Sequence, residues 1–218
     1  MNSQTEENYL KALFYLSRHK DEVNVRELSE RLDIKMPTVT SMMKKLAAKE
    51  LVHYESYKPV RLTEKGKKTA SQIIRKHRLT ETFLVNKMGF GWEEVDEIAE
   101  QLEHVHSPKF FEKMDELLGY PALDPHGSPI PDKRGNMRVG GYKIITEFNP
   151  GDVVELTAVL DTSHEFLSFL NNKELHLGIN IEIVHVEPFD HSVIVRYAGH
   201  SREMLSETIS QKLLAEKK

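Results

Sequence analysis

Glu100, Glu103 and His104 are the residues whose types and spacing most clearly indicate chemistry. On a helix, the spacing i, i+3 and i+4 places three side chains on one face, where they can converge on one point. Asp96 joins this face one turn earlier. Carboxylates together with an imidazole suit manganese, iron or zinc. The pattern therefore predicts a metal site, and the alternative is an acidic helix face that is only solvated.

The composition limits what else the chain can do. Its 218 residues, 39% hydrophobic and 29% charged, suffice for one large domain or for two to three small ones. The lack of cysteine excludes disulfides, thiolate nucleophiles and cysteine zinc sites. No apolar run is long enough to span a bilayer and no signal-peptide pattern begins the chain, so we expect a cytoplasmic protein with no membrane partner.

Charge is distributed unevenly along the chain. Between residues 35 and 78, twelve Lys or Arg stand against three Glu, whereas between residues 80 and 124, three Lys stand against eleven Asp or Glu. The first segment suits a polyanion and the second suits cations. A surface that is only solvated gives no reason for net charge to change so abruptly from positive to negative. The two segments therefore indicate two binding functions.

The first third of the chain has the pattern of a winged helix-turn-helix. Ser3 with Glu6 and Asn24 with Glu27 are capping-box pairs that begin two helices. Pro37 fits the first turn of a third helix, and two short strands around a basic turn follow it as the wing. This arrangement typically binds double-stranded DNA, and the alternative is an ordinary three-helix packing unit.

The expected DNA contacts lie on the third helix and the wing. Small hydroxyl residues near the start of such a helix can reach base edges, and basic residues can hold phosphates. The predicted DNA-binding residues are Lys35, Pro37, Thr38, Thr40, Ser41, Lys44, Lys45, Lys58 and Arg61.

Three further helices are predicted in the middle of the chain, over residues 63–88, 92–104 and 108–118. A single winged helix reads only half of a palindromic site. Helices of this kind usually bury their apolar face against a second copy, so we expect a homodimer that suits a palindrome.

Several motifs stand out in the first 132 residues. They are Thr5-Glu6-Glu7-Asn8-Tyr9-Leu10, Pro37-Thr38-Val39-Thr40, Leu62-Thr63-Glu64-Lys65-Gly66, Arg75-Lys76-His77-Arg78-Leu79-Thr80-Glu81 and Ala99-Glu100-Gln101-Leu102-Glu103-His104. The run from Leu118 to Pro131 belongs to the same pattern. Both the motifs and the spacing between them resemble those of the diphtheria toxin repressor and manganese transport regulator family of metal-dependent bacterial repressors.

The resemblance implies a repressor of metal-uptake genes that requires a divalent metal. Its primary site would take ligands at Glu100, Glu103 and His104, and one more from the first helix at Asn8. Iron-sensing members have cysteine at position 100, so a glutamate there favours Mn²⁺, with Fe²⁺ as the second candidate and other divalent transition metals able to bind. Asn8 departs from the family's aspartate or methionine. Lys11 stands where one manganese-sensing subgroup has glutamate, which argues against a close pair of metals.

An ancillary site in the family uses residues that match His77 and Glu81. The further matching positions are Asp96, Asp124, His126, Asp161 and His164. The alternative for those in loops is that they are solvated or form turns.

The last third of the sequence predicts a linker or an ordered loop, followed by a small β domain. Four prolines and four glycines fall within residues 121–141. Period-two patterns predict three strands, a short helix follows the first strand, and a final helix is expected from Ser201 to near Leu214. Such short strands indicate a half-open SH3-like barrel, which the resemblance also implies as a FeoA-type domain. The predicted strands cover residues 153–160, 180–186 and 192–197, and the short helix covers residues 163–170.

The chain is therefore expected to be mainly α with a small β domain. Its expected parts are a winged helix-turn-helix DNA-binding domain (1–63), a helical metal-binding and dimerisation domain (64–120), the linker (121–141) and the SH3-like domain (142–218).

The functional hypothesis is a repressor that binds palindromic operator DNA as a dimer once Mn²⁺ or Fe²⁺ is bound. Without metal, we expect Glu100, Glu103 and Glu81 to repel one another and the winged helix to be held loosely. One alternative is a winged-helix regulator that answers to a non-metal ligand. Another is a metallohydrolase, but the chain lacks His-Glu-x-x-His and a nucleophile elbow, so no enzymatic activity and no substrate are expected.

Overall fold

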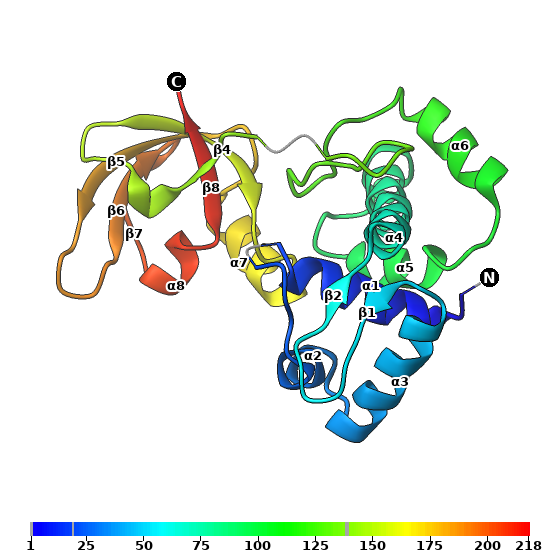
Figure 1. Ribbon diagram of the computed structural model, residues 1–218. Helices are drawn as coiled ribbons and strands as arrows, with labels where there is room; N and C mark the ends of the chain where they lie inside the picture. The colour runs from blue at the N-terminus through cyan, green and yellow to red at the C-terminus, as the bar shows by residue number, and fades with distance from the viewer. Residues whose placement is uncertain (1, 19, 138–139) are drawn as a thin grey trace. The chain divides into compact units, whose positions relative to one another are not determined.

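The computed structural model describes residues 2–18, 20–137 and 140–218, which fall into two compact units (Figure 1). The first unit comprises residues 1–80, 99–117 and 130–137, and the second comprises residues 81–98, 118–129 and 138–218. The architecture is helical with a small β domain, as the sequence predicts. No helix of the described residues has both the length and the apolarity needed to cross a membrane.

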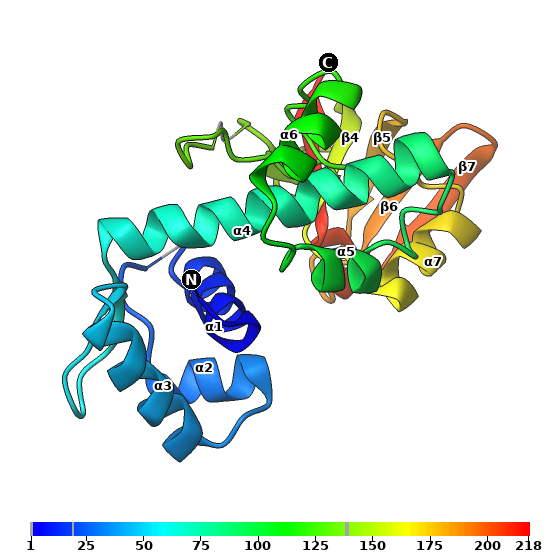
Figure 2. The same cartoon turned by 90° about the vertical axis from the view of Figure 1, so that its right-hand side faces the viewer.

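The winged helix is built from three helices and a hairpin (Figure 2). The capping boxes predicted at the starts of its first two helices are both present. The two strands of the wing pair antiparallel, as expected. The elements are α1 (Gln4–Leu16), α2 (Val25–Leu32), α3 (Met36–Ala48), β1 (Val52–His53) and β2 (Arg61–Leu62).

Helix α3 is oriented by the turn before it and by its buried face. Asp33 takes a left-handed conformation, with φ of 52°, that ends α2. Pro37 stands in the first turn of α3, where its missing N–H costs nothing. The inward face is apolar, so the hydroxyl and basic residues of α3 lie on the opposite face. The buried residues of α3, each 0% exposed, are Val39, Met43 and Leu46.

The long helix predicted after the wing is confirmed. Helix α4 (Glu64–Phe83) continues into a π-helical turn, η1 (Leu84–Met88). Gly66 is required near its start, because a Cβ there would lie 1.9 Å from the backbone oxygen of Leu51. Helix α6 (Pro108–Leu117) also forms where the sequence predicts it.

Helix α5 (Asp96–Leu102) is shorter than the predicted helix over residues 92–104. Turns occupy the four residues before it, because a glutamate side chain of this segment accepts a backbone N–H at 2.7 Å and so favours a turn over a helix. Glu103 and His104 lie in the turn that follows α5. The Glu103 N–H still donates to the Ala99 carbonyl at 2.9 Å, so the expected helical spacing extends to Glu103.

The second unit contains a six-stranded antiparallel sheet in the order β3-β8-β4-β5-β6-β7, which forms the expected SH3-like domain. Helix α7 (His164–Asn172) contributes its apolar face to the core of this domain. A short 3₁₀ turn, η2 (Ile145–Glu147), follows the first strand. The strands are β3 (Lys143–Ile144), β4 (Val153–Val159), β5 (Asn180–Val186), β6 (Val193–Tyr197), β7 (His200–Leu205) and β8 (Leu213–Lys217).

The predicted final helix is wrong. Its segment forms β7, one helical turn called α8 (Glu207–Ser210), and β8. Leu213 and Ala215 are 0% exposed, whereas Leu214 between them is half-buried. This alternation has the period of a strand. Because β8 pairs with both β3 and β4, sheet pairing outweighs the helix signals of the segment.

The proline- and glycine-rich segment is an ordered loop over residues 121–137. In the second unit, the Asp124 N–H donates to a carbonyl four residues later at 2.9 Å and closes a turn. Gly127 has φ of +81°, and a Cβ there would lie 2.1 Å from the Thr157 carbonyl oxygen. A backbone N–H of β4 donates to the His126 carbonyl at 3.0 Å. This contact fixes the loop that carries two candidate ligands against the β domain.

Candidate metal centre and DNA interface

Glu100 and Glu103, two of the predicted primary ligands, meet in the first unit. Together with His77 and Lys11 they form what we call the Glu103 cluster. Oxygen atoms of the two glutamates and a ring nitrogen of His77 lie within 4.8 Å of one another. His77 Nδ1 lies 2.7 Å from Glu103 Oε2. Glu103 is 0% and His77 is 7% exposed, so a residue predicted for the ancillary site lies buried beside two predicted primary ligands.

The Lys11 ammonium lies inside the Glu103 cluster. Its Nζ donates to both carboxylate oxygens of Glu103 at 2.8 Å, and it also donates to Glu100. Burial disfavours the charge on Lys11, but the charges and hydrogen bonds of Glu103 and Glu100 outweigh burial and raise the pKa of Lys11. The expectation that these two glutamates repel one another without metal leaves out the positive charge that Lys11 of α1 places between them.

Two further predicted ligands, His104 and Asn8, each have a buried polar atom that makes no hydrogen bond within the described part of the chain. His104 Nδ1 lies 2.6 Å from Glu7 Oε2, while His104 Nε2 lies 3.6 Å from Glu103 Oε1. Within the part of the chain that the structure describes, His104 Nε2 and Asn8 Oδ1 are buried without a hydrogen-bond partner. Buried polar atoms are rarely left in this state, so these two atoms fit a cation.

Glu81, Asp124 and His126 form a second group of donors, the His126 cluster, within the second unit. One ligand atom from each lies within 4.8 Å of the others, and the residues are 2%, 7% and 1% exposed. His126 Nδ1 lies 3.5 Å from Glu81 Oε1. Two buried carboxylates beside one imidazole form a donor set that suits a divalent ion.

The orientation of the His126 ring favours metal binding through Nδ1. His126 Nε2 lies 2.8 Å from the Trp92 carbonyl oxygen, so it is the nitrogen that donates. The other nitrogen, Nδ1, then keeps its lone pair, and it has no hydrogen-bond partner among the described residues. Metal-binding histidines usually have their second nitrogen fixed in this way. Asp124 Oδ1 accepts the His126 backbone N–H at 2.9 Å, which holds the loop in shape.

The remaining predicted ligands lie outside both clusters as defined. Asp96 is the exposed first residue of α5. Asp161 forms an ion pair with Lys212. His164 is exposed, and its Nδ1 lies 3.0 Å from a backbone carbonyl oxygen in the second unit. Their roles as ligands remain predictions.

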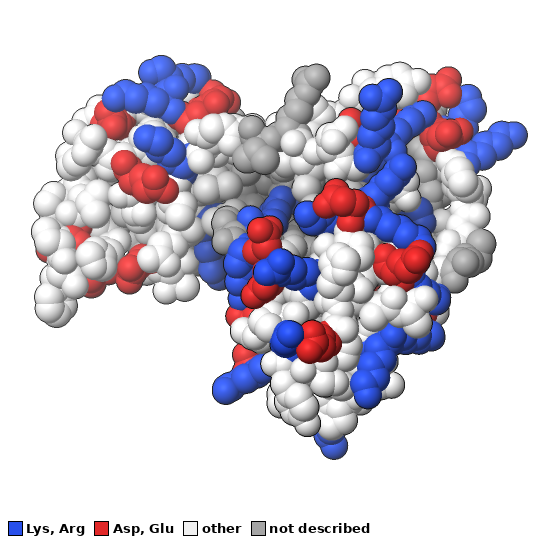
Figure 3. Space-filling model, in the orientation of Figure 1, with Lys and Arg blue, Asp and Glu red and all other residues white. Residues whose placement is uncertain are grey.

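The predicted DNA-binding residues share the outer face of α3 and the wing, where Figure 3 shows many basic side chains. Thr40 is half-buried and the others are exposed. A groove of about 480 Å³ separates α3 from the wing, and Thr40, Lys44 and Lys58 line it. The exposed members are Lys35, Pro37, Thr38, Ser41, Lys44, Lys45, Lys58 and Arg61.

Some basic residues of this face form ion pairs within the chain, and others do not. Lys45 lies 3.1 Å from Glu6, Lys58 is paired with Glu55, and Arg61 is paired with Glu22. Among the described residues, neither Lys35 nor Lys44 has an ion pair. These two lysines are therefore the strongest candidates for phosphate contacts, because they lose no internal partner when DNA binds.

Three functional candidates were not predicted as site residues. Glu7, Lys11 and Tyr57 contact the clusters or line the groove. Glu7 and Lys11 lie one turn apart on α1 with Asn8 between them, so their shared face was a usable signal. Tyr57 is fully exposed at the wing and has φ of 67°, and no spacing rule identifies such a residue.

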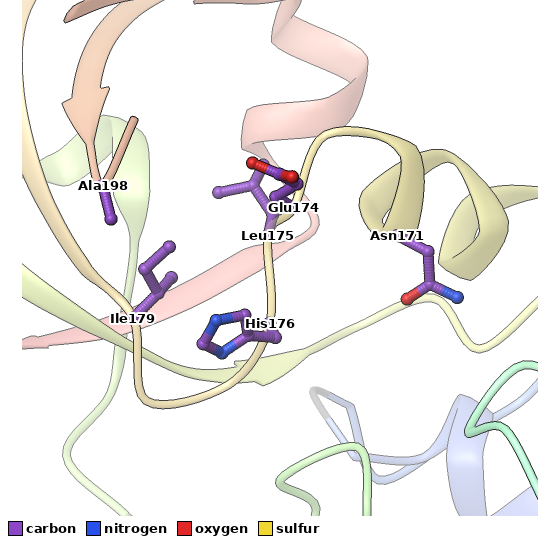
Figure 4. Close-up of a pocket in the computed structure, with 6 residues that line it drawn as sticks. All are labelled: Asn171, Glu174, Leu175, His176, Ile179 and Ala198. Atoms are coloured by element: carbon purple, nitrogen blue, oxygen red, sulfur yellow. The ribbon is translucent and has the colours of Figure 1, made fainter. Parts of the chain in front are cut away.

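A pocket of about 420 Å³ in the β domain is separate from the predicted ligands (Figure 4). It lies between the end of α7, the loop that follows α7, and the turn after β6. No predicted metal ligand lines it, so it is not the candidate metal centre. Its lining residues are Asn171, Glu174, Leu175, His176, Ile179 and Ala198.

Three family descriptions match consecutive parts of the chain. "Iron dependent repressor, N-terminal DNA binding domain" matches residues 1–60, and "Iron dependent repressor, metal binding and dimerisation domain" matches residues 63–132. "FeoA domain" matches residues 145–217. The matches follow the same order as the winged helix, the helices with the ligands, and the β domain.

Individual proteins extend this similarity. A solved structure described as a manganese-dependent transcriptional repressor in complex with manganese is 28% identical, with a TM-score of 0.87 over 98% of this chain and 100% of that chain. ScaR with bound Zn²⁺ is 34% identical, with a TM-score of 0.81 over 98% and 99%. The iron-dependent repressor IdeR of Mycobacterium bovis is 35% identical over 127 residues, 58% of this chain and 55% of IdeR. The match thus spans about half the length of that curated relative.

Proposed function

Because the chain belongs to the iron-dependent repressor family of metal-dependent transcriptional regulators, we propose that it represses transcription by binding operator DNA when a divalent ion is bound. Mn²⁺ is the favoured ion and Fe²⁺ the second candidate, since the donors are carboxylate oxygens and imidazole nitrogens. The family consists of DNA-binding repressors rather than enzymes, so the metallohydrolase alternative is set aside.

The His126 cluster is the observation that carries the metal requirement. Glu81, Asp124 and His126 would hold the ion there, with the Trp92 carbonyl fixing the ring. A bound ion would supply positive charge to buried carboxylates and would join the chain segments that carry them. The ligands proposed for the primary site are Glu100, Glu103 and His77 of the Glu103 cluster, together with His104 and Asn8. Asp96, Asp161 and His164 are proposed as further ligands.

The DNA-reading part of the proposal depends on α3. Its exposed start carries Thr38 and Ser41, whose hydroxyl groups can reach base edges in a major groove. Lys35 and Lys44 flank them and would hold phosphates. Lys45, Lys58 and Arg61 would add weaker phosphate contacts, because each must share its charge with a glutamate of the chain.

We further propose that the chain acts as a homodimer in the cytoplasm. On α6, Phe110 is 43% and Leu117 is 62% exposed. Apolar side chains that gather on one helix surface usually mark a contact between proteins. A two-fold dimer would present two α3 helices to a palindromic operator.

Selection of DNA fragments from a random pool, in Mn²⁺ or in chelator, tests this function. We expect a palindromic sequence to be enriched with Mn²⁺ and not with chelator. The variant Lys44→Ala, in the same buffer, should enrich the same sequence but retain less DNA at equal protein concentration. Equal enrichment with chelator would instead favour a winged-helix regulator that answers to a non-metal ligand.

A further inference from the structure

The Lys11 side chain occupies the centre of the Glu103 cluster as a metal ion would. Its Nζ lies 2.8 Å from each carboxylate oxygen of Glu103 and also donates to Glu100. The Lys11 side chain is 12% exposed and that of Glu100 is 39% exposed. The cation is thus nearly buried, and the cluster opens to solvent on the side of Glu100.

An ion and the ammonium cannot occupy this position together. A divalent ion binds carboxylate oxygens at about 2.0–2.6 Å. An ion at that distance from both Glu103 oxygens would come into contact with Nζ. The two positive charges would also repel one another strongly in so buried a place.

We propose that Lys11 is a tethered competitor of the divalent ion, which fills the Glu103 cluster in the metal-free protein and must withdraw before an ion can bind Glu100 and Glu103. This inference rests on the proposed function, because it takes those glutamates as ligands. Lys11 therefore sets the metal concentration at which the Glu103 cluster fills.

The size of the effect follows from how rarely the ammonium withdraws. When a site is open for only a fraction of the time, the apparent dissociation constant rises by the inverse of that fraction. Lys11 has a flexible four-carbon stem, so it can leave without unfolding α1. An open fraction between 1% and 10% would weaken metal binding on the order of 10- to 100-fold.

Lys11 also joins α1 to the turn after α5 before any ion binds. Glu7, one turn earlier on α1, reaches the same turn through His104 Nδ1 at 2.6 Å. These two contacts hold α1 against that turn. Removal of the ammonium should loosen α1 in the metal-free state and at the same time improve metal binding, two effects that a purely structural lysine would not combine.

Mn²⁺ titration calorimetry on Lys11→Met tests the proposal. The Lys11→Met change is made in a His126→Ala background. That background removes metal binding at the His126 cluster, so the titration reports binding at the Glu103 cluster. The dissociation constant should fall on the order of 10- to 100-fold relative to His126→Ala alone. Lys11→Gln gives a second uncharged variant should Lys11→Met fold poorly. The control Lys67→Met removes an exposed lysine that is paired with Glu64, and it should leave the Mn²⁺ dissociation constant unchanged. Unchanged or weaker binding in both uncharged variants would overturn the proposal.

Hydrogen exchange of the protein without added metal provides a second measurement. Amides of α1 should exchange faster in Lys11→Met, and Mn²⁺ should restore their protection. Lys11→Arg keeps the charge, so its Mn²⁺ affinity and its α1 exchange rates should remain close to those of the natural chain.

The failure of this inference can be told apart from the failure of the proposed function. If the natural chain shows Mn²⁺-dependent DNA binding while Lys11→Met leaves Mn²⁺ affinity and α1 exchange unaltered, this inference fails and the proposed function stands. If Lys11→Met binds Mn²⁺ more tightly but no variant binds DNA in a metal-dependent way, the inference stands and the proposed function fails.

Discussion

The two clusters differ in the residue that faces their carboxylates. In the Glu103 cluster, the Lys11 ammonium already supplies a positive charge. In the His126 cluster, an imidazole nitrogen with an unshared lone pair lies 3.5 Å from Glu81. An ion entering the first cluster must displace a cation, whereas an ion entering the second gains a ready nitrogen ligand. We therefore expect the His126 cluster to bind the divalent ion more tightly.

Loss of a donor from the His126 cluster should remove one bound ion. Residues that only orient a ligand typically contribute 10- to 100-fold to metal affinity, so loss of a ligand should cost at least about 10-fold. Equilibrium dialysis with Mn²⁺ should thus show one ion fewer per chain for His126→Ala and for Glu81→Gln. His176→Ala, an exposed histidine of the same unit, should bind like the natural chain. Equal stoichiometry in all three variants would exclude the cluster as a metal site.

Sequence spacing predicted part of these clusters and missed the rest for a physical reason. Glu100 and Glu103 are close in sequence, and helical spacing brings them together. Lys11 and Glu103 are 92 residues apart, so their contact depends on how α1 packs. His77 and Glu81, which were predicted as a pair one turn apart on one helix, both lie on α4. Local spacing does not determine which partner a helical residue meets across the fold.

At the scale of elements, α1 connects the recognition helix to the Glu103 cluster. On one side, Glu6 lies 3.1 Å from Lys45 and 2.7 Å from Lys49, both on or just after α3. On the other side, Glu7 and Lys11 contact the turn after α5. Movement of α1 would therefore be transmitted to α3 through the Glu6 carboxylate, which is 1% exposed and contacts both lysines.

The Glu6 contacts should make the stability of the winged helix sensitive to acid. Burial alone would raise the pKa of Glu6, but hydrogen bonds from Lys49, the Ser3 N–H and Lys45 lower it from 4.5 to about 2. Because the folded-state pKa is depressed, this contribution is present above pH 4.5 and is lost as the pH falls towards 2. The loss amounts to at most about 3 kcal/mol. The variant Glu6→Gln should lack this pH-dependent contribution to the free energy of unfolding. Urea unfolding at several pH values measures it.

Glu55→Gln is the matched control for this measurement, because Glu55 forms an exposed ion pair with Lys58 on the wing. Such pairs contribute little to stability. Its unfolding free energy should follow that of the natural chain across the same pH range. A Glu6→Gln variant with an equally steep loss of stability below pH 4.5 would contradict the account of α1.

The outward face of α3 should contribute to DNA affinity through phosphates. Lys44→Ala should weaken binding to every DNA sequence by a similar factor. The slope of log K for DNA binding against log salt concentration should become shallower by about 1. Lys67→Ala, on α4 and paired with Glu64, should leave the slope unchanged. Fluorescence anisotropy at several salt concentrations measures this slope. An unaltered slope for Lys44→Ala would remove this lysine from the DNA interface.

Element boundaries show where sequence patterns fail. The capping boxes at Ser3 and Asn24 predicted the starts of α1 and α2, because a cap is a local interaction. The start of α5 was predicted four residues too early, since competing side-chain contacts form a turn there. The segment after Ser201 was predicted as a helix, but β8 pairs on both sides within the sheet. Strand pairing of this kind is decided by distant residues.

For the whole molecule, charge separation along the sequence becomes a separation of roles. The basic segment forms α3, the wing and most of α4, and the acidic segment provides all four carboxylates of the two clusters. The fold class could be predicted because each segment also has its own pattern of caps, periodicity and turns. What the sequence could not predict is that Lys11 of α1 lies against the carboxylate of Glu103, 92 residues away.

Operator affinity as a function of free Mn²⁺ tests the central claim most directly. Anisotropy with the selected palindrome should show tight binding that saturates as the His126 cluster fills, and a chelator should reverse it. The double variant Glu81→Gln, His126→Ala should need at least about 10-fold more Mn²⁺ for the same affinity. If the natural chain, stripped of metal, binds the palindrome as tightly as it does in Mn²⁺, then divalent ions do not control this protein.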